Sequence, residues 1–185
     1  MIEKLEKEMR EKMEGALENT GHEFSRIRTG RASVTLFDGI KVSYYGSVVP
    51  LNQVATLAVP ESRLVTIQPW DAKSIGDIEK AILKSDLGLT PTNDGKIIRV
   101  PIPALTEERR KELVKVVKKG AEKAKVSLRS IRREVNEELK SLKKEKEISE
   151  DEYYTYHDEV QQLTDEYIQK VEELEAEKEK ELMEL

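Results

Sequence analysis

The sequence of 185 residues contains no cysteine, two histidines and a single tryptophan. Without cysteine it can form neither a disulfide nor a thiolate metal site, and His22 and His157 have no partner ligand at metal-binding spacing. No apolar run is long enough to span a membrane, and acidic residues in the first turns rule out a transit peptide. We therefore expect a cytoplasmic protein that binds no metal and no cofactor.

An overall excess of positive charge is also missing. There are 32 Lys and Arg residues against 37 Asp and Glu residues, which gives a net charge of -5. Bulk charge therefore cannot drive nucleic-acid binding, so any such binding must depend on where the charges lie. Their distribution is uneven: residues 118–133 contain seven basic residues and one acid, whereas residues 150–185 contain fourteen acids and three lysines.

Basic residues follow one line along a predicted helix. At 100° per residue this line lies beside the apolar seam, and we expect it to be displayed to solvent. We call it the basic stripe, and its members are Lys118, Lys125, Arg129, Arg132, Lys140 and Lys143. Arg133 lies further round the same helix. Arginine forks in such a row suit a phosphate backbone, although a solvated face that pairs with the acidic third helix is the simpler interpretation.

Three long amphipathic helices are predicted. Apolar residues recur every three or four positions over 2–28, and this helix is expected to end at Thr29-Gly30, where glycine can adopt the left-handed conformation. A second helix is expected over Thr106–Glu145. The third begins at Ser149–Glu152, which has the pattern of a capping box. Because each helix has one apolar seam, the three should pack as an elongated antiparallel bundle.

Between the first two helices the apolar period changes to that of strands. Alternation predicts strands over 40–44, 54–59, 64–67 and 96–102, with a short helix before the last of them. Residues 31–104 should therefore form a small α/β domain inserted into the bundle, which is built from residues 1–29 and 106–185. The predicted fold class is α+β with two domains.

Two linkers should join these domains. Their residues are Thr29, Gly30 and Arg31 in the first linker, and Pro101, Ile102, Pro103, Ala104 and Leu105 in the second. Prolines stiffen the second linker and Gly30 loosens the first, a combination typical of a hinge with a limited range.

Several segments, in order along nearly the whole chain, match the motifs of one family: Ile27–Ser33, Tyr44–Gly46, Ser85–Leu89, Ile98–Pro101, Thr106–Arg110, Arg129–Arg133 and Lys146–Glu150. In these segments the chain resembles bacterial ribosome recycling factors. The resemblance implies a monomeric factor that acts after termination, with its bundle on the RNA of the large ribosomal subunit. Elongation factor G, hydrolysing GTP, then acts with it to separate the subunits and release messenger RNA. The inserted domain is expected to swing about its linkers and meet elongation factor G.

Charge pattern and resemblance together predict the residues that contact ribosomal RNA. They are Arg28, Arg31, Lys118, Lys125, Arg129, Arg132, Arg133 and Lys140. The acidic third helix is expected to face away from the RNA, because phosphate repels it, and this repulsion would orient the bundle.

Tyr44, Tyr45 and Trp70 are interpreted as core or partly buried residues of the small domain. No basic cluster surrounds them in the sequence, so a role in stacking on RNA has no support.

Catalysis by the chain itself is not expected. Gly95-Lys96 lacks the spacing of a phosphate-binding loop, and Ile97 stands where that loop requires serine or threonine. No nucleophile and no acid–base pair stands out. The best alternative is a three-helix adaptor whose basic stripe pairs with an acidic partner protein. A hydrolase with an unrecognised site would require turnover by the isolated protein.

Overall fold

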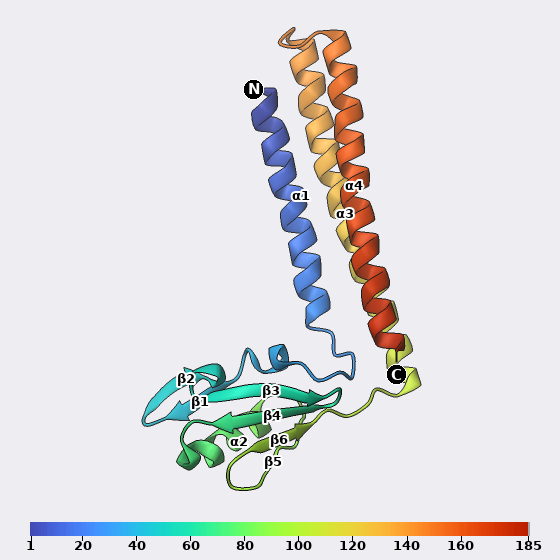
Figure 1. Cartoon of the computed structure of the whole chain (residues 1–185). Coiled ribbons are helices and arrows are strands. Elements are labelled where there is room, and N and C mark those ends of the chain that lie inside the picture. Colours follow the sequence, from blue (N-terminus) through green and yellow to red (C-terminus); the bar gives the residue numbers. More distant parts are fainter. Residues whose placement is uncertain (185) are drawn as a thin grey trace. The chain divides into compact units, whose positions relative to one another are not determined.

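The structure is a computed structural model that describes residues 1–184. It divides into two compact units (Figure 1). The first contains Met1–Ile27 and the described chain from Glu107 onward, and the second contains Arg28–Thr106. The N-terminal and C-terminal parts of the sequence thus build one unit, and the middle of the sequence builds the other.

The first unit is a bundle of three helices, α1 (Ile2–Ser25), α3 (Glu107–Lys144) and α4 (Glu150–Met183). Each helix buries one seam against the other two because its apolar residues recur at helical spacing. The fully buried side chains of this core include Met9, Met13, Val117, Leu128, Leu139, Val171 and Leu182. α3 and α4 follow one another and pack side by side in opposite directions, as their seams predict.

α1 ends earlier than its sequence pattern predicts. The helix stops at Ser25, with Arg26 as its C-cap, so the expectation that it continues to Thr29-Gly30 is wrong. The Ser25 hydroxyl donates a 2.7 Å hydrogen bond to the carbonyl of His22, which satisfies one of the last helical acceptors. Gly30 does have a positive φ of 76°, but it lies in the connection rather than at the helix end.

The reversal between α3 and α4 is built from two capping motifs. Lys146 has a φ of 63°, and the amide of Glu147 donates to the carbonyl of Leu142 over 2.9 Å, which closes α3. At the start of α4, the amide of Glu152 donates to the Ser149 hydroxyl over 3.1 Å, and the amide of Ser149 donates to the Glu152 carboxylate over 2.7 Å. The predicted capping box is therefore confirmed.

The second unit, which we call the inserted domain, contains two small antiparallel sheets. One has the order β3-β4-β6-β5, and the other is the β1-β2 hairpin. The strands are β1 (Lys41–Tyr44), β2 (Ser47–Pro50), β3 (Ala55–Glu61), β4 (Leu64–Pro69), β5 (Thr92–Asn93) and β6 (Ile98–Pro101). The helices are α2 (Ile75–Lys84) and the 3-10 turns Val34–Phe37, Leu51–Gln53 and Ala72–Ser74.

Sequence patterns miss two of these strands, β2 and β5. β5 has two residues, too few to show alternation, and β2 is exposed at its first two positions, so it has no buried face to reveal it. β1 and β2 are joined by the two residues Tyr45 and Gly46, which have φ values of 47° and 81°. These are the backbone angles of a type I′ hairpin turn, in which a tyrosine is an unusual first residue.

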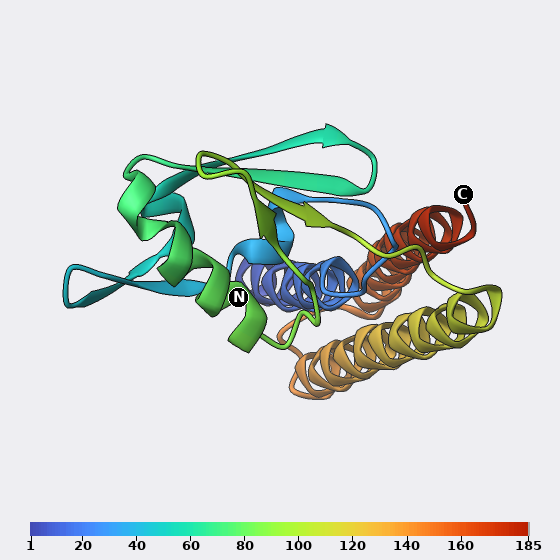
Figure 2. The ribbon, with the colours of Figure 1, turned by 90° about the horizontal axis from the view of Figure 1, so that it is seen from below.

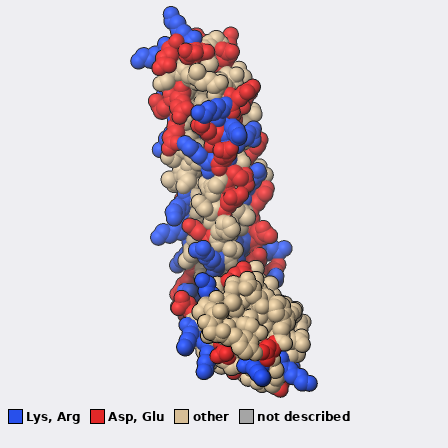
Figure 3. All heavy atoms as spheres, turned by 90° about the vertical axis from the view of Figure 1, so that its left-hand side faces the viewer, with Lys and Arg blue, Asp and Glu red and all other residues tan. Residues whose placement is uncertain are grey.

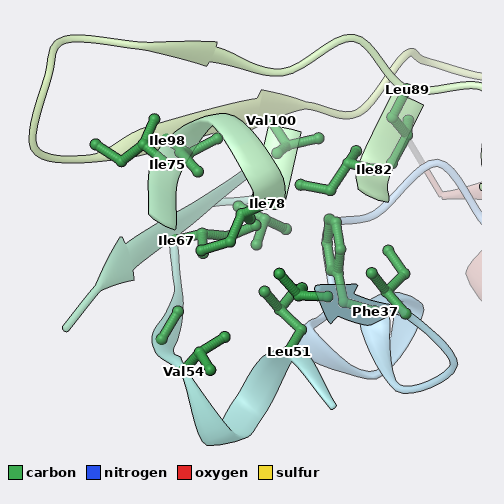
Figure 4. Packing of buried hydrophobic residues seen from close by; sticks show 14 of the residues in the cluster. Phe37, Leu51, Val54, Ile67, Ile75, Ile78, Ile82, Leu89, Ile98 and Val100 are labelled. Carbon is green, nitrogen blue, oxygen red and sulfur yellow. The ribbon is translucent and has the colours of Figure 1, made fainter. Parts of the chain in front are cut away.

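The core of the inserted domain lies between its four-stranded sheet and the layer formed by α2 and the hairpin. Figure 2 shows α2 and the β1-β2 hairpin on the same side of that sheet. Figure 4 shows the side chains that meet there, which include Phe37, Leu51, Ile67, Ile78, Ile82, Ile98 and Val100. The packing holds the hairpin and both ends of the domain in fixed positions on one scaffold.

Candidate nucleic-acid interface and domain junction

Two members of the basic stripe, Lys125 and Arg132, contact α4 instead of pointing freely into solvent. The Nζ of Lys125 lies 3.1 Å from a carboxylate oxygen of Glu172 on α4, and the Lys125 side chain is only 16% exposed. An Nη of Arg132 lies 3.4 Å from the side-chain oxygen of Gln161, also on α4. The expectation that the stripe is displayed to solvent is therefore wrong at these two positions. They lie close enough to the buried seam for α4 to cover them.

Two further members pair along α3 itself. An Nη of Arg129 is 3.2 Å from Glu122, and the Nζ of Lys140 is 3.0 Å from Glu137. The hydrogen bond to Glu137 raises the pKa of Lys140. Both cations remain accessible to solvent, so a phosphate can replace the carboxylate of either pair at little cost.

Lys118 faces the acidic side of α4 and forms no ion pair with another residue that the structure describes. Burial raises the pKa of Glu175 on α4, and the neighbouring Glu179 carboxylate raises it further, while Lys125 and Lys118 act in the opposite direction. The cations of α3 therefore serve partly to compensate crowded carboxylates on α4. The simpler interpretation of the stripe, pairing with the acidic third helix, holds for this part of the bundle.

The outermost face of α3 carries three cations opposite the seam. Lys115, Lys119 and Arg133 fall within about 40° of one another at 100° per residue. All three are exposed, and none of them forms an ion pair with another described residue. We call these three residues the outer cations. Arg133 is among the residues predicted from the sequence to contact RNA, whereas Lys115 and Lys119 are not, because they lie outside the line of basic residues nearest the seam.

Arg28 is engaged by the inserted domain. Its guanidinium donates to the backbone carbonyls of Leu87 and Asp86, the latter over 3.1 Å, in the segment that follows α2. These are charge-assisted hydrogen bonds, and they hold the guanidinium on the inserted domain while the side chain stays exposed. Arg31, the other candidate in the first linker, is exposed.

Both predicted linkers are attached to the inserted domain. The amide of Ala32 donates to the carbonyl of Ser62 over 2.7 Å, and the amide of Ile102 donates to the carbonyl of Arg63 over 2.8 Å. The two chain segments therefore dock on the same β3-β4 turn.

They also meet each other. A Cβ built on Gly30 would lie 3.4 Å from the side chain of Leu105, so the first linker passes directly over the second. The residues predicted as the hinge lie inside the compact unit Arg28–Thr106.

Two of the aromatic residues interpreted as buried are exposed. Tyr45 lies in the hairpin turn and Trp70 at the end of β4, and each has most of its side chain in solvent. Only Tyr44 is partly buried. The interpretation fails because an aromatic residue in a strand pattern normally faces a core, whereas both of these stand just beyond the last paired positions.

Among residues 1–184 no group of three or more acidic, histidine or cysteine side chains could hold a metal ion. None of the described helices is both long and apolar enough to cross a membrane.

A sequence description of one family, ribosome recycling factor, matches residues 20–183. The chain belongs to this family. Relatives named ribosome-recycling factor include a protein from Desulfatibacillum aliphaticivorans, 56% identical over all of both chains, and one from Syntrophus aciditrophicus, 58% identical over 96% of each chain. Their full-length agreement means that the bundle and the inserted domain are both features of the family.

Solved structures of the family have the same fold. A solution structure of a ribosome recycling factor aligns with a TM-score of 0.78 at 44% identity and covers 99% of this chain and 97% of its own. A second aligns with a TM-score of 0.66 at 45% identity over the whole of both chains. It belongs to models of the T. thermophilus ribosome recycling factor and the E. coli elongation factor G bound to the E. coli post-termination complex.

Proposed function

We propose that this protein binds the post-termination ribosome and, together with elongation factor G and GTP hydrolysis by that factor, splits the ribosomal subunits and releases messenger RNA. The observation that carries the proposal is the full-length identity of 52–58% to relatives named ribosome-recycling factor. It acts in the cytoplasm, where ribosomes are, and makes or breaks no covalent bond itself. Its work is binding and mechanical leverage.

The bundle binds ribosomal RNA through the outward side of α3. The outer cations supply positive charge that forms no ion pair within residues 1–184, and Arg129 and Arg132 lie at the edge of the same surface. Lys125 contributes to the fold instead, because its ammonium is held by Glu172. Phosphate contacts of this kind fix the orientation of the protein without reading sequence.

α4 keeps the bundle from binding in the wrong orientation. Residues 150–185 carry fourteen acids and three lysines, so this side of the bundle is repelled by phosphate. Attraction along α3 and repulsion along α4 together select one way of lying on RNA. This selection explains how an acidic protein can bind a polyanion specifically.

The inserted domain moves as one body together with both linkers. Arg28 holds the first linker through two carbonyls, and the amides of Ala32 and Ile102 hold both linkers on the β3-β4 turn. The pivots therefore lie just outside the attached segments, at Ile27–Arg28 and Thr106–Glu107. Two pivots, one on each connecting strand of chain, let the inserted domain swing as a unit while both connections limit its range.

Light scattering of purified post-termination ribosomes tests the function. The protein is mixed with matched elongation factor G, GTP and an anti-association initiation factor. A drop in scattering that needs the protein, elongation factor G and hydrolysable GTP is the expected result, and no drop in the complete mixture would refute the proposal. The double variant Lys119→Ala/Arg133→Ala should split far less at the same concentration. Lys4→Ala/Lys7→Ala, which also removes two positive charges, at exposed lysines of α1, is the matched control.

A further inference from the structure

Arg132 differs from the lysines of α3 that face α4, because its partner on α4 is neutral. An Nη of Arg132 donates to the side-chain oxygen of Gln161 over 3.4 Å. Among residues 1–184 this guanidinium forms no other hydrogen bond and no ion pair. Both residues are half-buried, so the contact lies at the edge of the seam between the two helices.

Nearer the C-terminal end of α4, carboxylates meet the lysines of α3. The Nζ of Lys125 is paired with Glu172 over 3.1 Å. Burial raises the pKa of Glu175, and Lys125 and Lys118 both act against this rise, so both lie close enough to feel its charge. Gln161 is the exception in this row. Where α4 meets the arginine, it presents an amide instead of an acid.

The amide of Gln161 is held at both ends. Its oxygen accepts from Arg132, and its Nε2 donates to a carboxylate oxygen of Asp165 over 2.9 Å, one turn further along α4. A guanidinium can only donate and an ionised carboxylate can only accept, so these two partners allow the amide one orientation. Asp165 therefore holds Gln161, and Gln161 holds Arg132.

A neutral acceptor orients an arginine without cancelling its charge. A carboxylate at this half-buried position would pair with Arg132 as Glu172 pairs with Lys125, and the pair would have to break before a phosphate could bind. The amide oxygen of Gln161 accepts one N–H only. It leaves the positive charge and the remaining N–H groups of the fork available to a phosphate.

Orientation in the free protein also lowers the entropic cost of binding. Arginine has one of the most flexible side chains, and part of this freedom is lost when its fork meets a phosphate. Because Gln161 already restrains Arg132, less freedom remains to be lost. The fork is held at the edge of the surface that carries the outer cations.

Charges of both signs are mixed on the α1 side of the bundle. Figure 3 shows this side, on which Lys and Arg are interspersed with Asp and Glu along the bundle. One example on α1 is Lys4, whose Nζ lies 3.6 Å from a carboxylate oxygen of Glu8. A surface of mixed sign offers a polyanion little net attraction. A neutral partner for a single cation therefore matters on the side of α3, where the basic stripe lies.

We propose that Gln161 is a positioning residue for the binding of ribosomal RNA, which keeps the guanidinium of Arg132 both charged and oriented for a phosphate. Asp165 holds Gln161 in turn. This inference rests on the proposed function, which places Arg132 against ribosomal RNA. Gln161 does not contact the RNA, so its effect is exerted entirely through Arg132.

Two substitutions of Gln161 test the two parts of this role in the full-length protein. Gln161→Met has a similar size but only a weak acceptor, so it releases Arg132 and leaves its charge. Gln161→Glu keeps the shape and adds a charge that pairs with Arg132. The matched controls are Gln169→Met and Gln169→Glu. Gln169 is exposed on α4 and also donates to an acid four residues on, Glu173, over 3.4 Å, but it contacts no cation of α3 within the described chain.

The affinity of each variant for purified large ribosomal subunits is measured between about 50 and 200 mM salt. Gln161→Met should weaken binding about threefold to tenfold and leave the slope of log affinity against log salt unchanged, because the same number of phosphates is neutralised. Gln161→Glu should weaken binding and also lower the slope by about 0.7–0.9, as loss of one phosphate contact does. Both controls should bind within about twofold of the unchanged protein.

Combination with Arg132→Ala distinguishes positioning from a structural effect. Arg132→Ala/Gln161→Met should bind like Arg132→Ala alone, since Gln161 then has no guanidinium to hold. A further loss of affinity in the double variant would show that Gln161 supports the bundle as a whole, and this result would overturn the inference.

The outcomes also separate the inference from the proposed function. If the unchanged protein does not bind large subunits, the proposed function fails and the inference fails with it. If Arg132→Ala weakens binding and neither variant of Gln161 does, only the role of Gln161 is refuted. If Arg132→Ala has no effect, Arg132 makes no phosphate contact, which refutes the inference and leaves RNA binding to the outer cations.

Discussion

Lys119 and Lys125 lie six residues apart on α3, and the structure gives them opposite roles. Lys119 is exposed and forms no ion pair within the described part of the chain, whereas the ammonium of Lys125 is paired with Glu172 and its side chain is 16% exposed. We predict that Lys119→Ala weakens large-subunit binding without affecting stability, and that Lys125→Ala does the reverse. Both substitutions remove one lysine, so the change in net charge is the same.

The expected sizes follow from the two environments. Loss of one phosphate contact should lower the slope of log affinity against log salt by about 0.7–0.9, which is a loss of roughly fivefold at 0.1 M salt. For Lys125→Ala, a partly exposed ion pair contributes about 0.5 kcal/mol and its covered methylenes about 1 kcal/mol more. A loss of this size lowers the melting temperature by about 3–6 °C in a chain of this length.

The assay is binding of each variant to large ribosomal subunits between 50 and 200 mM salt, with a thermal melt of the same samples. Equal salt slopes for Lys119→Ala and the unchanged protein would refute the assignment of the outer cations to RNA. A reduced slope for Lys125→Ala with an unchanged melting temperature would show that the bundle pair opens on binding and that our reasoning from burial is wrong.

Three further predictions concern the fold. Leu128→Ala in the fully buried seam should cost about 2–5 kcal/mol of unfolding free energy, measured by denaturant titration, while the exposed Val126→Ala should change it by less than about 0.5 kcal/mol. Arg28→Ala should broaden the distance distribution between spin labels on the two units, and an unchanged distribution would contradict the role given to its two carbonyl contacts. The pKa of Asp94 is lowered to about 2, because its carboxylate accepts hydrogen bonds from the amides of Ile97 and Lys96 and from the guanidinium of Arg99. Its stabilising contribution should be complete above pH ~4 and be lost as pH falls toward 2, and Asp94→Asn should remove that part of the acid titration.

Much of the fold can be predicted from the sequence because its signals are local. The seams of the three long helices repeat at 3.6-residue spacing, and the Ser149–Glu152 capping box depends on four neighbouring residues. Strands β1, β3, β4 and β6 show alternation because one of their faces is buried. Where this local cause is absent, as in β2 and β5, the sequence carries no pattern to read.

The sequence by itself determined that α3 is basic, that α4 is acidic and that a small α/β domain interrupts the bundle. These are properties of composition and period along one chain segment. Only the tertiary structure decided which cations are available, because α4 covers Lys125 and leaves Lys119 open. It also decided that Arg28 binds carbonyls of the inserted domain and that Tyr45 in the β1-β2 turn binds Asp71. Each of these outcomes depends on residues far apart in sequence that packing brings within hydrogen-bonding distance, and no periodicity encodes such a distance.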